Sequence, residues 1–152
     1  MSTFKYNEKQ IDQYINLAAV FGSWSKDPSK KVGAVAIGNY GQVLSQGYNG
    51  FPRNFKDYPF LYESKTLKNN YIIHAEMNCI YHAAINNVSL ENASLFVHGL
   101  HVCHECAKGI IQTGIKEVYS FCSGPFSSKW LHSFNITDEL FEEANIKYKK
   151  IN

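Results

Sequence analysis

From residue 74 to residue 150 the sequence alternates between helix-type and strand-type patterns, and this alternation limits the folds open to the chain. Helical patterns cover 74–86 and 103–113, and short strand-like runs cover 94–98, 116–121 and 146–150. A further amphipathic helix carries Leu140, Phe141 and Ala144, with Thr137 as its expected N-cap. Helices and strands in alternation predict an α/β fold.

The first seventy residues add one helix, one hairpin and one irregular segment. Asn7 and Gln10 have capping-box spacing before a helix that should end near Gly22. Two apolar runs at 32–37 and 42–48 are separated by a glycine-containing turn, which predicts a β-hairpin. The segment 49–71 carries glycine and two prolines and is expected to be a long loop with room for one short helix.

Length and composition favour one compact domain over residues 1–152, since two domains would each be too small to bury an adequate core. The formal charge of +2 is nearly balanced and the basic residues are scattered. A small-molecule substrate is therefore expected, and a nucleic-acid partner is not. No secretory leader and no run of about 20 apolar residues is present, so we expect a cytoplasmic protein without a membrane partner.

Two short motifs fall at the starts of predicted helices: His-Ala-Glu at 74–76 and Cys-His-Glu-Cys at 103–106. A helix of about 13 residues runs roughly 20 Å away, and a strand of about six residues returns over a similar distance. The second helix therefore starts where the first one did. If both helices lie on one face of the sheet, His74 converges with Cys103 and Cys106.

One imidazole and two thiolates suit a single zinc ion. Structural zinc sites usually have four protein ligands, whereas this chain offers three and has no second Cys-x-x-Cys pair, which favours a catalytic site with a position left for water. Helix N-termini stabilise thiolates. Zinc lowers the pKa of water toward 7, and Glu76, two residues after His74, is the candidate for moving protons without binding the metal.

Simpler interpretations exist for each residue alone. Cys103 and Cys106 could form a redox pair, His74 could be a structural histidine, and Glu76 could be a favourable acid in a first helical turn. The joint occurrence of these residues favours the metal site. Cys79 and Cys122 have no motif around them and are expected to be buried small apolar residues. His101 and His104 flank the cysteines, either as a fourth ligand or base stackers, or in an outer or surface position.

HAEMNCI at 74–80 and CHECAKGIIQTGI at 103–115 resemble the deoxycytidylate deaminases of the zinc-dependent cytidine deaminase superfamily. SKDPSKKVGAV at 25–35 and GYNGFPR at 47–53 do so too, and the resemblance runs from about Ser25 to Val118. It implies a three-layer α/β/α sandwich around a five-stranded mixed sheet. The implied reaction is hydrolytic removal of the 4-amino group of dCMP, which gives dUMP and ammonia.

The same resemblance implies that Glu76 protonates the pyrimidine N3 and later the departing amine. It also implies that Asn49 meets the sugar and that the Ala75 backbone meets the pyrimidine edge. Among the loop aromatics we expect Phe51 nearest the substrate. A homo-oligomer is expected because related small deaminases complete their pockets with neighbouring subunits; its size stays open.

Two basic residues are candidates for the substrate phosphate. Arg53 is the only arginine in the chain, and a guanidinium suits bidentate phosphate recognition. Lys31 is the other candidate. Solvated surface charge is the alternative for both.

The chain departs from the family pattern directly before the first cysteine, where the family has proline and this chain has Val102. Valine restores a backbone N–H that needs a partner if it is buried, and the turn loses a fixed φ. Pocket shape and rate could change, whereas metal binding should survive. The long loop also lacks a further Cys/His cluster, so a second zinc is not expected.

Besides the deamination of another nucleoside or nucleobase, two other functions stay open. A tRNA adenosine deaminase shares the metal motifs but needs basic surface for RNA, and the C-terminal helix is acidic at 138, 139, 142 and 143. A catalytically impaired zinc-binding module is the second alternative, against which the retained Glu76 argues.

Overall fold

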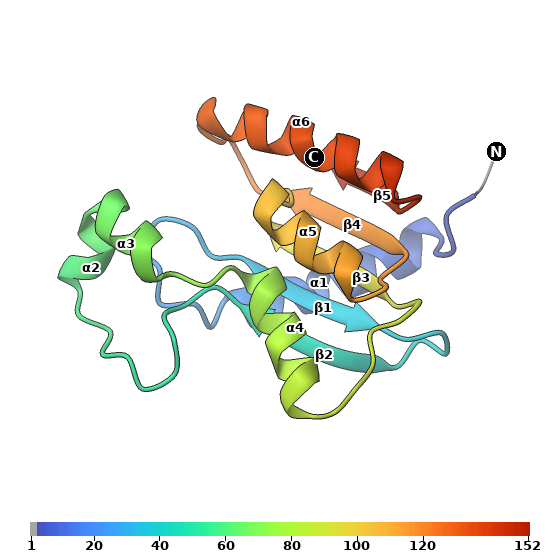
Figure 1. The fold of residues 1–152 in the computed structure, drawn as a ribbon, viewed down its shortest axis with the longest axis horizontal. Helices are drawn as coiled ribbons and strands as arrows, with labels where there is room; N and C mark the ends of the chain where they lie inside the picture. Colours follow the sequence, from blue (N-terminus) through green and yellow to red (C-terminus); the bar gives the residue numbers. More distant parts are fainter. Residues whose placement is uncertain (1–2) are drawn as a thin grey trace.

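A computed structural model describes residues 3–152 as a five-stranded mixed sheet with helices on both faces (Figure 1). The elements in chain order are α1 (Glu8–Gly22), β1 (Gly33–Ile37), β2 (Val43–Tyr48), α2 (Phe60–Glu63), α3 (Lys65–Tyr71), α4 (Ala75–Ile85), β3 (Ser94–Gly99), α5 (His104–Gln112), β4 (Glu117–Cys122), α6 (Lys129–Glu143) and β5 (Lys147–Ile151). The strand order is β2-β1-β3-β4-β5. β1 is antiparallel to β2 and β3, whereas β3, β4 and β5 are parallel, as the family resemblance implied.

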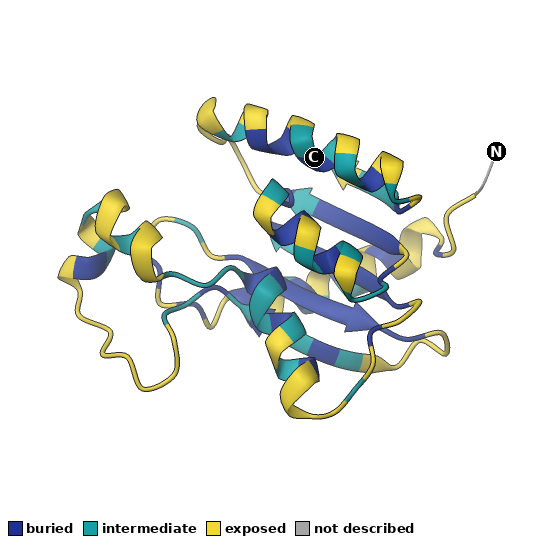
Figure 2. Ribbon diagram, viewed as in Figure 1, coloured by how far each residue is buried: buried dark blue, intermediate teal, exposed yellow. Residues whose placement is uncertain are grey.

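Two apolar cores lie on the two faces of this sheet. On one face α1 buries Ile11, Ile15 and Ala18 against Phe96 and Tyr119 of the strands. The other core lies under α4, α5 and α6 and is the larger of the two. Figure 2 shows the sheet buried along β1 and β4, while the helices are exposed on the side away from it. This confirms the predicted three-layer arrangement, and no helix in residues 3–152 has the length and hydropathy to span a membrane.

The helix and the hairpin predicted for the N-terminal part are both present. Asn7 caps α1, and the reciprocal bonds between Asn7 and Gln10 complete the capping box. β1 and β2 form the expected hairpin, with an irregularity in register between Ala36 and Ile37, next to the turn. The segment 49–71 holds two short helices where we expected room for one. The side chain of Ser64 accepts a hydrogen bond from Leu67 and starts the second of them, α3.

The prediction that Thr137 caps the last helix is wrong. α6 begins at Lys129, and Thr137 lies inside it, fully buried. Its hydroxyl donates to the carbonyl of Ser133 one turn back and to the carbonyl of Val102. Threonine is tolerated in this helix interior because its single O–H is shared between a carbonyl of the same helix and the carbonyl of Val102.

The helix α4 packs against β2, and three side-chain contacts to backbone carbonyls hold the two elements together. Asn78 Nδ2 donates to Tyr48 O at 2.8 Å, Ser45 Oγ donates to Cys79 O at 2.7 Å, and a ring nitrogen of His82 lies 2.6 Å from the carbonyl of Gln46. The approach is possible because β2 has glycine at position 47. A Cβ there would lie 2.6 Å from the carbonyl oxygen of Ala75 in the first turn of α4.

Gly47→Ala should therefore destabilise the protein by about 1–3 kcal/mol, because the added methyl group meets helix backbone that cannot rotate away. Gly50→Ala is the matched control, since a Cβ at Gly50 meets nothing within 4 Å. Its free energy of unfolding should stay within about 0.5 kcal/mol of the parent. Urea unfolding measures both, and equal destabilisation by the two substitutions would contradict the close-approach argument.

Candidate metal centre

The first turns of α4 and α5 meet at the edge of the sheet where β3 and β4 end, and in Figure 1 the two helices cover the same face. His74 is the N-cap of α4 and Cys103 is the N-cap of α5. His74 Nδ1 lies 3.4 Å from the sulfur of Cys103 and 3.4 Å from the sulfur of Cys106. The convergence expected from helix and strand lengths is therefore confirmed.

The spacing of these three atoms fits a tetrahedral zinc ion. Zinc binds imidazole nitrogen at about 2.0–2.1 Å and thiolate sulfur at about 2.3 Å, so tetrahedral angles place nitrogen and sulfur about 3.5 Å apart. The observed separations match this value, and the ligand atoms of all three residues lie within 4.8 Å of one another. The geometry suits a site with three protein ligands.

The charges of the two thiols point to a cation as well. A hydrogen bond from Cys106, assisted by His74, lowers the pKa of the Cys103 thiol to about 4. The hydrogen bond to that neighbouring sulfur and burial raise the pKa of Cys106 above its ordinary value. A second thiolate beside that of Cys103 is therefore disfavoured unless additional positive charge is present, and a divalent metal ion would supply it.

Glu76 lies in the first turn of α4 and is 4% exposed. Burial raises the pKa of its carboxyl group to about 7, despite the opposing effect of His74. A carboxyl group with such a pKa can both accept and donate a proton near neutral pH. Glu76 lines the same cavity as His74 and Cys103, as a proton carrier next to a metal site must.

A cavity of about 320 Å³ is lined by two of the clustered side chains, His74 and Cys103, and by Glu76. Its volume lies within the range of small-molecule sites. Loops at one edge of the sheet build the wall, because β3 and β4 end there, β2 ends there and β1 begins there. The contributing segments lie within 27–32, 65–76, 100–103 and 125–130, together with Asn49.

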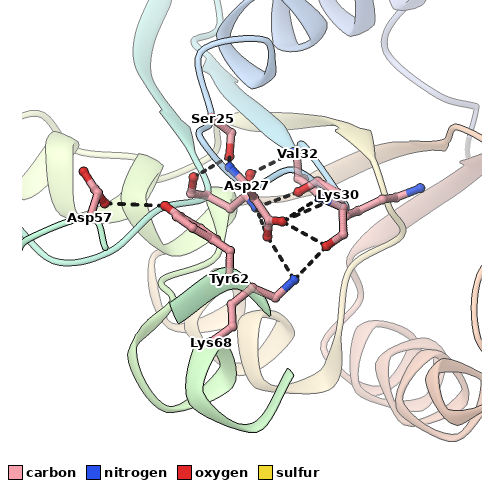
Figure 3. Close-up of polar contacts among 9 residues, drawn as sticks. Ser25, Asp27, Lys30, Val32, Asp57, Tyr62 and Lys68 are labelled. Carbon is pink, nitrogen blue, oxygen red and sulfur yellow. Dashed lines mark hydrogen bonds and ion pairs between the residues drawn. The ribbon is translucent and has the colours of Figure 1, made fainter. Parts of the chain in front are cut away.

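Asn49 is fixed by a buried polar network, part of which Figure 3 shows. Its Oδ1 accepts from Val32 N at 2.9 Å, and its Nδ2 donates to Lys30 O at 2.9 Å and to the Asp27 carboxylate at 3.4 Å. Lys68 Nζ lies 3.1 Å from the same carboxylate. Burial raises the pKa of Asp27, but its hydrogen bonds outweigh that effect and hold the pKa below the ordinary value. The Asn49 amide is thus held in one orientation at the cavity wall.

Two of the predicted substrate contacts, Asn49 and Ala75, line the cavity, and three do not. Phe51 stacks on Tyr62 with ring centroids 4.7 Å apart. Arg53 is exposed, and Lys31 borders a separate hollow with His98 and Ser123. Substrate roles for these three residues stay predictions.

The cavity wall also contains side chains that were not predicted from the sequence. Four lysines line it, at positions 30, 65, 68 and 129. Phe126 and Trp130 close it from the segment after β4, and the Trp130 ring centroid lies 6.4 Å from that of His74. One general signal pointed to this last segment, since ligands in α/β sheets bind beyond the carboxyl ends of parallel strands.

The other two cysteines are buried, and the two histidines that flank the metal-ligand cysteines each lie near a serine hydroxyl. Cys79 and Cys122 are buried, as predicted. His101 is buried at the cavity wall with Nδ1 2.7 Å from Ser120 Oγ, and His104 Nδ1 lies 2.8 Å from Ser133 Oγ. Neither histidine belongs to the cluster of potential metal ligands found in residues 3–152.

Comparison with known proteins gives the class. Residues 8–122 match the model of the cytidine and deoxycytidylate deaminase zinc-binding region. The chain therefore belongs to this family of zinc-dependent hydrolytic deaminases.

Individual relatives point to one branch of the family. The chain is 33% identical over 147 residues to human deoxycytidylate deaminase, covering 91% of this chain and 78% of the human protein. It is 34% identical over 142 residues to an uncharacterized deaminase of Aliivibrio fischeri, covering 91% of each. The apo crystal structure of dCMP deaminase from the cyanophage S-TIM5 superposes with a TM-score of 0.74 at 25% identity, covering 96% of this chain and 100% of that one.

His74→Ala should abolish stoichiometric zinc binding, because two sulfurs alone leave the site without its nitrogen ligand. Metal analysis of purified protein by mass spectrometry measures this. His132→Ala, at an exposed histidine of α6, is the control and should keep one zinc per chain. Full zinc content in the His74 variant would disprove the assignment.

Proposed function

We propose that this protein deaminates dCMP to dUMP and ammonia in the cavity between α4, α5 and the start of α6. The observation that carries this proposal is the placement of buried Glu76 beside three converging metal-ligand atoms within a cavity of nucleotide size. Relatives named deoxycytidylate deaminase, at about a third identity over most of the chain, support the substrate.

His74, Cys103 and Cys106 hold the zinc. A zinc ion held by these three residues would supply Lewis-acid chemistry, which would lower the pKa of water toward neutrality for attack at C4 of the pyrimidine. Glu76 takes up a proton from the attacking water and delivers it to N3, then takes up the proton of the new C4 hydroxyl group and passes it to the amine, which departs as ammonia. Burial at the cavity wall favours the protonated form of this carboxyl group, as delivery of a proton to the substrate requires. Asn49 binds the sugar in the single orientation that its own hydrogen bonds allow, and the Ala75 backbone meets the pyrimidine edge.

The charges at the cavity mouth favour a nucleotide over a nucleoside. The lining holds two carboxylates, of which Asp27 is paired with Lys68 and Glu76 lies at the metal end. Lys30, Lys65 and Lys129 have no carboxylate partner among residues 3–152. Such an excess of ammonium groups attracts an anionic 5′-phosphate.

The tRNA adenosine deaminase alternative receives fold-level support alone. A tRNA:A34 deaminase structure superposes with a TM-score of 0.50 at 24% identity over 75% of this chain. The acidic residues at 138, 139, 142 and 143 lie on α6, which borders the cavity through its first turn. Release of ammonia from an anticodon stem-loop and not from dCMP would favour this alternative.

Three further expectations belong with this proposal. We propose that the chain folds as one domain, acts in the cytoplasm, and forms a homo-oligomer whose size the sequence leaves open. Analytical ultracentrifugation of the zinc-loaded protein tests the last of these.

Glu76→Gln should lower kcat for dCMP by at least about 100-fold, since general acid–base catalysis contributes roughly 10²–10⁴. Zinc content and the dissociation constant for dCMP should stay close to the parent, because the amide keeps the shape of the side chain. Steady-state ammonia release, metal analysis and calorimetric titration measure the three quantities. If parent protein with one zinc per chain releases no ammonia from any cytosine nucleotide, the zinc-binding module is favoured instead.

Lys65→Ala and Lys129→Ala should each raise KM for dCMP about fivefold with little change in kcat, since a partly exposed charged contact contributes about 1 kcal/mol. Values for deoxycytidine, which has no phosphate, should not change. Lys9→Ala on the exposed side of α1 is the charge-matched control. An equal rise in KM for both substrates would argue against phosphate recognition by these lysines.

A further inference from the structure

Side chains from the C-terminal elements hold both backbone polar groups of Val102, the residue directly before the first cysteine ligand. Val102 is fully buried. Its N–H donates to the hydroxyl of Tyr148 in β5 at 3.2 Å, and its carbonyl accepts from Thr137 in α6 at 2.9 Å. Both partners lie beyond residue 122, where the match to the family model ends.

These contacts satisfy the backbone N–H that Val102 introduces where the family pattern has proline. Proline, which the family pattern has before the first cysteine, offers no N–H, so a turn with proline leaves nothing to satisfy. Valine adds a donor at a position without access to water. A buried donor without a partner is costly, and Tyr148 provides the acceptor.

Several contacts hold the Tyr148 hydroxyl in place. The tyrosine ring packs edge-to-face on Phe141, with centroids 5.0 Å apart. The hydroxyl lies 2.9 Å from Ser120 Oγ in β4, and that oxygen lies 2.7 Å from His101 Nδ1 at the cavity wall. A chain of polar contacts therefore runs from β5 through β4 to the two residues that precede Cys103.

We propose that Tyr148 is a positioning residue for the metal ligand Cys103, and that its hydroxyl replaces the conformational restraint that proline provides elsewhere in the family. The proposal rests on the metal ligands proposed above. Cys103 is the N-cap of α5, so the peptide of Val102 determines where that sulfur enters the site. Groups that hydrogen-bond to metal ligands and orient them commonly affect metal affinity by about 10–100-fold.

A reciprocal pair of substitutions separates this role from simple core packing. Tyr148→Phe keeps the ring and its contact with Phe141 but leaves the Val102 N–H without an acceptor. Val102→Pro removes that N–H but places a ring carbon toward the Tyr148 hydroxyl, which lies 3.2 Å from the nitrogen. Together the two substitutions remove both the unsatisfied donor and the obstructing oxygen, so each should compensate for the other.

The experiment compares the parent, the two single variants and the double variant by zinc affinity, measured by competition with a chromogenic chelator. The thermal midpoint of the zinc-free proteins is measured alongside. Each single variant should bind zinc about tenfold more weakly, and the double variant should return to within about threefold of the parent. Tyr119→Phe is the matched control: it removes another buried tyrosine hydroxyl, bonded to Glu117, and should leave zinc affinity unchanged.

Two results would overturn the proposal. One is unchanged zinc affinity in Tyr148→Phe, and the other is a double variant as weak as the two single effects combined. If Tyr148→Phe does not accumulate as folded protein, the double variant decides: recovery of folded, zinc-binding protein supports the proposal, and continued misfolding contradicts it. Zinc retention in His74→Ala would instead refute the metal site itself, so the two failures are distinguishable.

Discussion

The site depends on the parallel pairing of β3 with β4. A parallel pair needs a crossover, and α5 provides it, starting at the edge where β3 ends. Because α4 runs toward the start of β3, its own first turn lies at that same edge. Two helix N-termini are thereby brought together, and the ligands His74 and Cys103 stand at their N-cap positions.

How much of this could be predicted depends on the range of the interactions. The metal ligands, Glu76 and the element order follow from local patterns, because helix and strand lengths alone place two helix starts at one edge. The features that the sequence did not predict depend on tertiary contacts. Thr137 has the residue type of an N-cap, yet its hydroxyl bonds to the Val102 carbonyl from inside a helix. Lys65 and Lys129 reach the cavity as the first residues of α3 and α6, helix starts that the sequence did not locate.

The segment 49–71 shows how an irregular stretch becomes part of a defined site. Its aromatic side chains pack on one another, with Phe51 stacked on Tyr62 and Phe55 tilted against Tyr71. Lys68 then joins the segment to the buried Asp27 carboxylate, which also receives the Asn49 amide. One carboxylate therefore links the irregular segment to the residue proposed to bind the sugar. Desolvation offsets much of the attraction in a buried ion pair, so this pair adds little stability. Its consequence is the fixed orientation of the groups around it.

The segments that line the cavity have different duties. His74, Glu76 and Cys103, at the starts of α4 and α5, carry the chemistry, whereas the segment 125–130, before and within the first turn of α6, forms a separate part of the wall, here called the roof. The roof contains none of the metal-ligand atoms. Evolution or design can therefore alter the roof to admit a different base or a bulkier sugar while the residues that carry the hydrolytic chemistry stay unchanged.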